Sequence, residues 1–217
     1  MLQLPGQVKT VKQKQPEKMH KTLSRREALA GAAVSTGIGL SGLTILPANA
    51  AKDSVEAFMK RSTSKLLKAA LNSSPKQFLN FIMRYTDVGG IAIYSLGSYR
   101  SGLEKKYERT YFSGMARHIT RYFTYQSRQY RIAKVEVGKK SWQVEDAYYI
   151  NTKLTLLTGA TYNVLWQIVR RNGRYKIANV RVLGFWLARF QRVQFESYIS
   201  KQGGKVNALV AILQSRK

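Results

Sequence analysis

The spacing of apolar residues changes near residue 130, and this change limits the chain to folds in which helices precede a sheet. Before it, apolar side chains return every three or four positions, which is typical of helices with one buried face. The clearest case is a stripe that recurs every fourth residue from about 102 to 125: Leu103, Tyr107, Tyr111, Met115, Ile119 and Phe123. It predicts the longest helix of the chain.

Two shorter helices are expected before it, at about 52–71 and 75–85. The sequence between them is Asn72-Ser73-Ser74-Pro75, in which Ser74 is suited to cap a helix that begins with proline. Asp87 is interpreted either as the cap of a helix that follows it or as a ligand contact.

After residue 130 the apolar residues alternate with polar ones, which is typical of strands with one buried face. Four antiparallel strands are expected in sequence order, at about 131–137, 142–156, 162–168 and 174–182. Thr158-Gly159 and Asn172-Gly173 stand where hairpin turns belong. With two last helices, at about 186–201 and 205–214, the chain is expected to form an α+β fold whose helices cover one face of a four-stranded meander sheet.

The segment 23–50 precedes this pattern and has three interpretations. The nineteen residues 28–46 carry no charge and approach the length of about 20 that a membrane span needs, but their glycines and hydroxyl residues make a weak span. The run GIGLSG at 37–42 matches a dinucleotide-binding pattern, yet no strand precedes it. A basic start, an apolar middle and the small-x-small sequence at 48–50 predict instead a signal peptide that is removed after Ala50.

Arg25 and Arg26 also resemble the paired arginines of a twin-arginine export signal. Ala28 stands where that signal commonly has an aromatic residue, so the general secretory route stays open as well. The expectation is an exported bacterial protein that works in the periplasm as a single domain from Ala51 to Lys217.

This mature domain is expected to be strongly basic. The chain has 37 Lys and Arg against 11 Asp and Glu, and residues 51–217 keep 30 and 9 of them, an excess of 21 positive charges. Such charge often indicates nucleic-acid binding. An exported protein meets phospholipid head groups, membrane surfaces and acidic proteins instead, so no nucleic acid is expected as a partner. The absence of cysteine excludes disulfides and cysteine-based metal or redox sites.

Residues for catalysis are scarce. Of the two histidines, one belongs to the expected signal, and His118 stands among arginines on the long helix, where a surface position is expected. Glu104 and Glu108 are one turn apart on that helix and fit surface ion pairs. Glu145 and Asp146 are adjacent, so in a strand they would point to opposite faces. The chain is expected to be no enzyme and to hold no cofactor or metal.

Large aromatic residues are in excess instead: 13 Tyr, 8 Phe and 3 Trp. The inward faces of the expected helices and strands offer more large apolar side chains than a small sheet with one layer of helices needs, which favours an apolar cavity between them. A filled core is the alternative for each of these residues. The candidate lipid-binding residues of the cavity are Phe81, Ile82, Ile91, Tyr111, Met115, Ile119, Tyr148, Ile150, Tyr162, Val164, Trp166 and Ile168.

Two segments resemble the MlaC family of exported phospholipid-binding proteins, also called toluene-tolerance proteins. In RYTDVGGIAIYSLGSYR, residues 84–100, the matching residues are Tyr85, Asp87, Val88, Ile91, Ala92, Leu96, Gly97 and Tyr99. In residues 179–213 they are Gly184, Leu187, Arg192, Gln194, Phe195, Gly203 and Leu209. Trp186, where a serine is usual, and Phe190-Gln191, where Asn-Tyr is usual, depart from the pattern.

The resemblance implies an NTF2-like cone that encloses lipid tails between its sheet and its helices and binds no cofactor. It also implies a soluble carrier that shuttles phospholipid between outer-membrane and inner-membrane complexes and so maintains the lipid asymmetry of the outer membrane. The implied partners are an inner-membrane ABC-type lipid transporter and an outer-membrane lipoprotein complex. For Arg192 and Gln194, local hydrogen bonds that fix the last helices are expected rather than head-group contacts.

Other functions stay open. The domain could be a basic periplasmic adaptor with a solid core that binds anionic partners or a membrane surface, or a small enzyme of the same cone-shaped class. A carrier could also hold another lipid, such as a hopanoid. Lipid that co-purifies with the domain would favour a carrier over an adaptor.

We predict that the exported protein begins at Ala51. A signal peptidase cuts after a small-x-small sequence, which Ala48-Asn49-Ala50 supplies. Amino-terminal sequencing of the protein recovered from the periplasm of a producing bacterium should therefore start at Ala51. A start before residue 47 would show instead that the segment stays attached as an anchor.

Overall fold

The computed structural model describes residues 54–215, which belong to a compact unit, Pro47–Lys217. The expected signal peptide, residues 1–50, lies outside the described residues. The first half is helical: α1 (Val55–Leu71), α2 (Pro75–Tyr85), α3 (Val88–Leu96), the 3-10 helix η1 (Gly97–Gly102) and α4 (Lys105–Gln129). The strands follow: β1 (Ile132–Val137), β2 (Trp142–Val144), β3 (Ala147–Leu156), β4 (Thr161–Arg171), β5 (Arg174–Val182) and β6 (Phe185–Trp186). The last elements are α5 (Leu187–Lys201) and α6 (Val206–Gln214).

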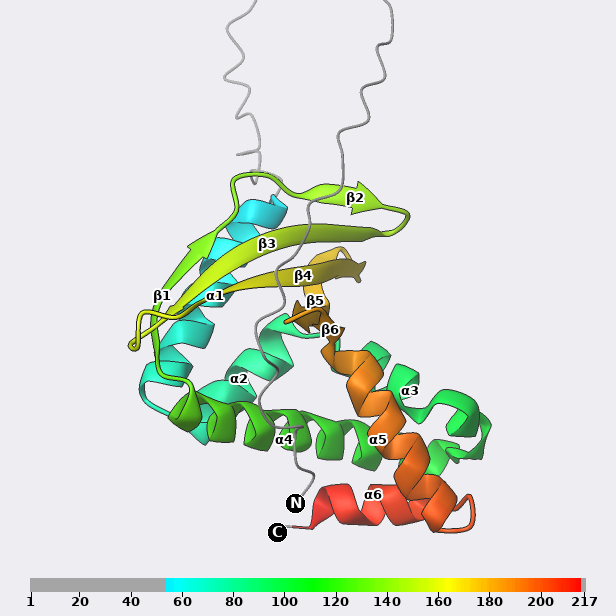
Figure 1. The fold of residues 1–217 in the computed structure, drawn as a ribbon. Helices are drawn as coiled ribbons and strands as arrows, with labels where there is room; N and C mark the ends of the chain where they lie inside the picture. Colours follow the sequence, from blue (N-terminus) through cyan, green and yellow to red (C-terminus); the bar gives the residue numbers. More distant parts are fainter. Residues whose placement is uncertain (1–53, 216–217) are drawn as a thin grey trace, which may run out of the picture. The chain divides into compact units, whose positions relative to one another are not determined.

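The strands form one antiparallel sheet in the order β1-β3-β4-β5-β6, and β2 also pairs with β3. Its four long strands, β1, β3, β4 and β5, are the four expected strands in the expected order. Helices α1 and α2 lie on one side of the sheet, and α6 is the helix farthest from it (Figure 1). The α+β fold with an antiparallel sheet is confirmed, and the sheet has two short strands more than expected.

The expected single strand over 142–156 is wrong, because the chain reverses at Glu145-Asp146. Glu145 has a left-handed backbone with a φ of 51°, and β2 folds back so that Trp142 pairs with Tyr149. Apolar and polar residues keep alternating through such a two-residue turn, since both of its arms have a period of two. Glu145 and Asp146 therefore lie in a turn and not in a strand.

Helix α3 is an additional helix between two expected ones. Asp87 caps it, because its Oδ1 accepts a hydrogen bond of 3.1 Å from the backbone N–H of Gly90. Ser74 caps α2 in the same way through a bond of 3.3 Å from the N–H of Gln77. The capping expected of Ser74 and, as one of two interpretations, of Asp87 is thus confirmed. Glycines at 89 and 90 weaken the helical pattern of α3 in the sequence.

Two large apolar clusters form most of the core. We call the first the sheet–helix layer, and its buried members are Val55, Phe58, Met59, Phe81, Ile82, Ala116, Ile150, Val164, Trp166, Ile168, Ile177 and Val180. We call the second the helix cluster, and its buried members come from α3, α4, α5 and α6: Ala92, Leu96, Tyr111, Met115, Phe195, Ile199, Val206, Leu209, Val210 and Leu213. The two clusters meet along α4.

Helix α4 reaches both clusters because its apolar stripe winds around its axis. Residues four apart differ by about 40° in direction around a helix of 3.6 residues per turn. Tyr111 and Met115 therefore pack in the helix cluster, whereas Phe123 packs against the sheet–helix layer. Ile119, between them in the sequence, contacts both clusters.

His118 is half-buried, which corrects the expectation that it lies on the surface. Its Nε2 is 2.8 Å from Oε1 of Gln191 on α5, and its ring centre is 5.6 Å from that of Phe195. Burial, together with the positive charge of Arg121, lowers the pKa of His118. The imidazole thus packs between α4 and α5.

Trp166 is the tryptophan among the buried residues of the sheet–helix layer. Its indole N–H is hydrogen-bonded. Its Nε1–H donates a hydrogen bond of 2.9 Å to Oγ1 of Thr152 on the neighbouring strand. Trp166 is 5% exposed and Thr152 is 2% exposed, so water cannot replace this bond. A buried donor without a partner costs about 1–3 kcal/mol, and Thr152 removes that cost.

We predict that Thr152→Val lowers the free energy of unfolding by about 1–3 kcal/mol, because the indole N–H of Trp166 then stays buried without an acceptor. Urea denaturation followed by circular dichroism measures the change. Thr155→Val is the matched control, since Thr155 lies on the same strand and pairs with Thr161 on the opposite face. Equal stability of the two variants would contradict the role given to the hydrogen bond.

Candidate functional site

One face of the sheet meets the helices, and strand pairing determines which side chains lie there. Residues that pair across an antiparallel ladder share a face. The pairs of β3 and β4 on the helix-facing side are Tyr148–Ile168, Ile150–Trp166, Thr152–Val164 and Leu154–Tyr162. Helices α1 and α2 add large apolar side chains from the other side, so an apolar layer separates the helices from the sheet.

Eleven of the twelve candidate cavity residues separate into two groups. Eight are members of the sheet–helix layer or pack against it: Phe81, Ile82, Ile119, Tyr148, Ile150, Val164, Trp166 and Ile168. Three are members of the helix cluster or pack against it: Ile91, Tyr111 and Met115. Tyr162 is half-buried near the start of β4, on the helix-facing side. The structure thus brings the sheet residues together as expected and turns part of the α4 stripe away from the sheet, while contact of these residues with a lipid stays a prediction.

Tyr111 illustrates the separate character of the helix cluster. It is fully buried, and its hydroxyl donates a hydrogen bond of 2.8 Å to the backbone carbonyl of Ala92 on α3. Burial raises the pKa of this hydroxyl. The polar atom of Tyr111 is therefore used to hold α4 against α3.

The sheet–helix layer also contains buried residues that the sequence pattern did not select as cavity candidates. Those on β5 are Ile177, which pairs with Ile168, and Val180, which pairs with Trp166. Residues 177–179 of β5 therefore lie opposite residues 167–168 of β4, as in a β-bulge. The alternation of inward and outward side chains along β5 shifts by one residue there. A search with a period of two misses Val180, and the signal that could have found it is the spacing of three between Ile177 and Val180.

A hollow of about 250 Å³ opens where the ends of α1, α4 and β3 meet the start of β1. Its apolar wall includes Leu71 and Leu157, which are 63% and 59% exposed. Arg128 and Arg131 line it as well. This mouth hollow, as we call it, therefore combines large apolar side chains with two cationic ones.

The mouth hollow is continuous with the sheet–helix layer. Ala70 lines the hollow and belongs with Phe78 to a small buried cluster. Leu66 and Phe123 pack against this small cluster, and both also pack against the sheet–helix layer. Apolar side chains thus extend without a break from the surface at Arg128 to the inner face of the sheet.

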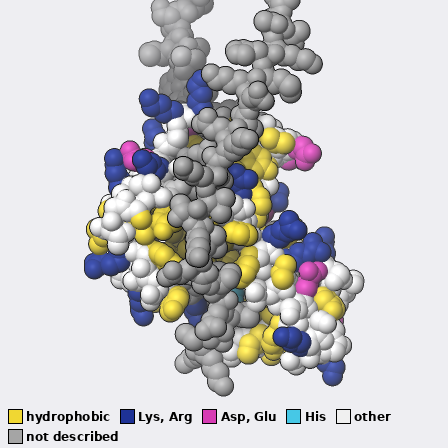
Figure 2. All heavy atoms as spheres, in the orientation of Figure 1, with side chains coloured by type: hydrophobic (Ala, Val, Ile, Leu, Met, Phe, Trp, Pro, Cys, Tyr) yellow, Lys and Arg dark blue, Asp and Glu magenta, His cyan; other side chains and the backbone are white. Residues whose placement is uncertain are grey.

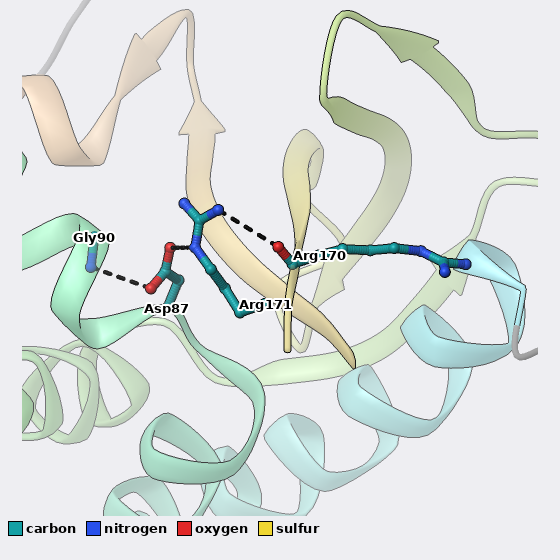
Figure 3. A network of polar contacts seen from close by, with 4 residues as sticks. All are labelled: Asp87, Gly90, Arg170 and Arg171. Carbon is teal, nitrogen blue, oxygen red and sulfur yellow. Dashed lines mark hydrogen bonds and ion pairs between the residues drawn. The ribbon is translucent and has the colours of Figure 1, made fainter. Parts of the chain in front are cut away.

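The other end of the strands is closed by polar contacts (Figure 3). Oδ2 of Asp87, at the start of α3, lies 2.8 Å from Nε of Arg171 at the end of β4. On the neighbouring strand, Nζ of Lys176 donates a hydrogen bond of 2.6 Å to the backbone carbonyl of Arg84 at the end of α2. These bonds fix α2 and α3 to the β4–β5 hairpin, far along the strands from the mouth hollow.

A second hollow, of about 330 Å³, is lined by residues of α3, η1 and α5 that include Arg192. Nε of Arg192 is 3.3 Å from Oε1 of Glu196, and its guanidinium carbon is 5.6 Å from the ring centre of Tyr94. A hydrogen bond of 2.9 Å from the backbone N–H of Ser98 lowers the pKa of Glu196. Arg192 thus makes local contacts within α5 and with α3. That Arg192 and Gln194 fix the last helices stays a prediction.

Acidic and metal-ligating side chains are spread out in the described part of the chain. Among residues 54–215, no group of three or more His, Cys, Asp and Glu is placed to hold a metal ion. In the same range, none of the helices has both the length and the hydropathy that crossing a membrane requires. The feature with the most definite chemistry is the apolar layer with its arginine-lined mouth hollow.

Comparison with known proteins assigns a family. A family model described as MlaC protein matches residues 52–215. A solved structure with a similar fold is the phospholipid-binding protein from Ralstonia solanacearum in complex with a phospholipid, with 16% sequence identity, a TM-score of 0.61, and coverage of 73% of this chain and 93% of that one. No protein of curated function matches the chain. Because the family model spans nearly all of the described structure, this chain belongs to the MlaC family.

Proposed function

We propose that the protein is a periplasmic phospholipid carrier that holds acyl chains between the sheet and the helices, with the head group at the mouth hollow. The observation that carries the proposal is the unbroken series of apolar side chains from the mouth hollow into the sheet–helix layer. Membership of the MlaC family supports a role in binding and transport rather than in catalysis. The phospholipid bound to the similar Ralstonia protein supports the choice of ligand.

The cost of removing a phospholipid from a bilayer explains why an internal layer is needed. Each methylene group kept from water is worth about 0.8 kcal/mol, so two chains with about thirty methylenes are held in the bilayer by roughly 20 kcal/mol. A shallow surface groove leaves much of each chain in water. The inner face of the sheet and the facing sides of α1 and α2 offer comparable burial if the lipid tails separate them.

The helix cluster would keep the fold together during such a separation. It joins α3, α4, α5 and α6 through buried residues of its own, and polar contacts at Asp87 and Lys176 hold the far end of the sheet to the helices. In this proposal the tails displace contacts within the sheet–helix layer, and the remaining core is unchanged.

Arg128 and Arg131 are suited to the phosphate of the head group. Both are exposed, so they can bind a phosphate that stays in contact with water. A guanidinium presents two parallel N–H groups that match two phosphate oxygens. Basic side chains are numerous over the visible face of the molecule and acidic ones are few (Figure 2).

The proposal includes export and partners. The protein would be cut near Ala50, work in the periplasm, and move lipid between an outer-membrane lipoprotein complex and an inner-membrane ABC-type transporter in the maintenance of lipid asymmetry. The excess of 21 positive charges in residues 51–217 supports fast encounters with acidic partner surfaces.

We predict that Val164→Trp abolishes the co-purification of phospholipid. Val164 is 1% exposed in the sheet–helix layer, and a tryptophan there would fill the space that a lipid tail needs, with a cost of overpacking of about 1–3 kcal/mol. Mass spectrometry of lipid extracted from gently purified protein, with circular dichroism as a check on folding, measures the effect.

Asn163→Trp is the control for this substitution. Asn163 is exposed and pairs with Lys153 on the opposite face of the sheet, so the same side chain is added outside the layer and lipid should be retained. A folded Val164→Trp protein with a full equivalent of phospholipid would show that the tails lie elsewhere. If the wild-type protein never carries lipid, the carrier proposal is wrong and the basic adaptor becomes the favoured function.

A second prediction concerns the mouth hollow. Replacing both Arg128 and Arg131 with Gln should lower phospholipid retention about tenfold, which corresponds to the loss of about 1.4 kcal/mol of phosphate binding. Exchange of a radiolabelled phospholipid between the protein and vesicles measures the retention. Lys60→Gln with Lys65→Gln removes the same charge from the exposed side of α1, and this control should behave as the wild type does. An equal loss in both double variants would assign the effect to net charge and not to the mouth hollow.

A further inference from the structure

Two hairpin turns of the sheet have similar backbones but different sequences. At the β4–β5 turn, Asn172 and Gly173 have φ angles of 50° and 74°, and at the β5–β6 turn, Leu183 and Gly184 have φ angles of 52° and 85°. Asn-Gly is a preferred sequence for such turns, because asparagine and glycine tolerate a positive φ. Leucine is uncommon in this conformation, so the backbone of the second turn does not explain its sequence.

Packing does not explain the leucine either. Leu183 is 67% exposed and Phe185 is 66% exposed. The space around Gly184 is open, since a Cβ atom added there would meet no other group within 4 Å. The turn therefore presents two large apolar side chains to its surroundings, and we call residues 183–185 the apolar tip.

All charged residues in the sequence around the apolar tip are basic. From Ala147 to Phe195 there is no Asp or Glu, and the eight charged residues are Lys153, Arg170, Arg171, Arg174, Lys176, Arg181, Arg189 and Arg192. Arg181 and Arg189, on either side of the tip in the sequence, are both exposed. The guanidinium carbon of Arg181 is 5.6 Å from the ring centre of Trp186, directly after the tip.

We propose that the apolar tip docks the protein on an anionic phospholipid bilayer, with Leu183 and Phe185 inserted among the head groups and Arg181 and Arg189 near the lipid phosphates. Large apolar side chains next to basic ones are the usual means of binding at a membrane interface. Tryptophan beside them is also typical of that depth. The tip lies at the β5–β6 edge of the sheet, whereas the mouth hollow lies at the β1 edge, so docking does not depend on where lipid is carried.

A bilayer fits the apolar tip better than a protein partner does. A stable protein interface buries about 800 Å² on each side, which needs a broad surface, and the tip consists of three residues on a turn with open space around it. Lipid head groups move aside for such a tip and need no matching pocket. The lack of carboxylates from 147 to 195 also removes the repulsion that anionic lipid exerts on acidic groups.

The test is flotation of the chain from Ala51 to Lys217, which lies within the compact unit Pro47–Lys217, with vesicles of mixed phosphatidylcholine and phosphatidylglycerol. Leu183→Asn together with Phe185→Ser should lower the bound fraction about tenfold, since the apolar insertion is lost. The fold should be kept, because Asn-Gly suits this turn as it does at Asn172. Phe185→Trp alone should keep the binding, because tryptophan is favoured at the interface.

Met83→Asn together with Ile212→Ser is the control, since these side chains are also exposed, 60% and 45%, but lie on α2 and α6. It should bind the mixed vesicles as the wild type does, and wild-type binding should fall with added salt and in vesicles of phosphatidylcholine alone. Wild-type protein that does not float with mixed vesicles, or a tip variant that floats as well as the wild type, would overturn the proposal. Loss of co-purified phospholipid in the tip variant would also overturn the proposal, because the tip would then belong to the lipid site. If the carrier proposal is wrong and the wild type carries no lipid, binding of the wild type to vesicles should be unchanged.

Discussion

Contact between one face of the antiparallel sheet and helices α1 and α2 is the interaction on which the rest of the structure depends. Pairing of β3 with β4 places their large apolar side chains on that one face, and the bond between Trp166 and Thr152 allows an indole to be buried among them. The winding stripe of α4 connects this layer to the helix cluster. A fold with two apolar clusters can open one of them for a ligand and keep the other as its core.

The distribution of charge follows from how the few acidic groups are used. Asp87 caps α3 and binds Arg171, and Glu196 binds Ser98 and Arg192. Hydrogen bonds from the side chain and the backbone N–H of Ser141 lower the pKa of Glu56 to about 2. These carboxylates hold elements of the fold together. Residues 51–217 have 30 basic side chains and 9 acidic ones. The surplus of positive charge is available to lipid phosphates and acidic surfaces.

Much of the fold could be predicted from the sequence, because its signals are local. The caps at Ser74 and Asp87 depend on a serine or aspartate within three residues of a free backbone N–H, and the four long strands depend on a period of two. Errors arose for two different reasons. A straight strand and the reversal at Glu145 have the same alternation, so periodicity does not distinguish them. His118 is half-buried because it contacts Gln191 of α5, 73 residues further along the chain.

The candidate site shows the same division. The sequence by itself determined the apolar face of β3 and β4, because alternation along each strand is a property of neighbouring residues. It also determined the excess of positive charge. Only the tertiary structure decided that Tyr111 turns away from the sheet, that a bulge brings Val180 to Trp166, and that Leu71, Arg128 and Leu157 surround one hollow. These arrangements depend on how segments far apart in the sequence pack together, and no periodicity within a single segment records that packing.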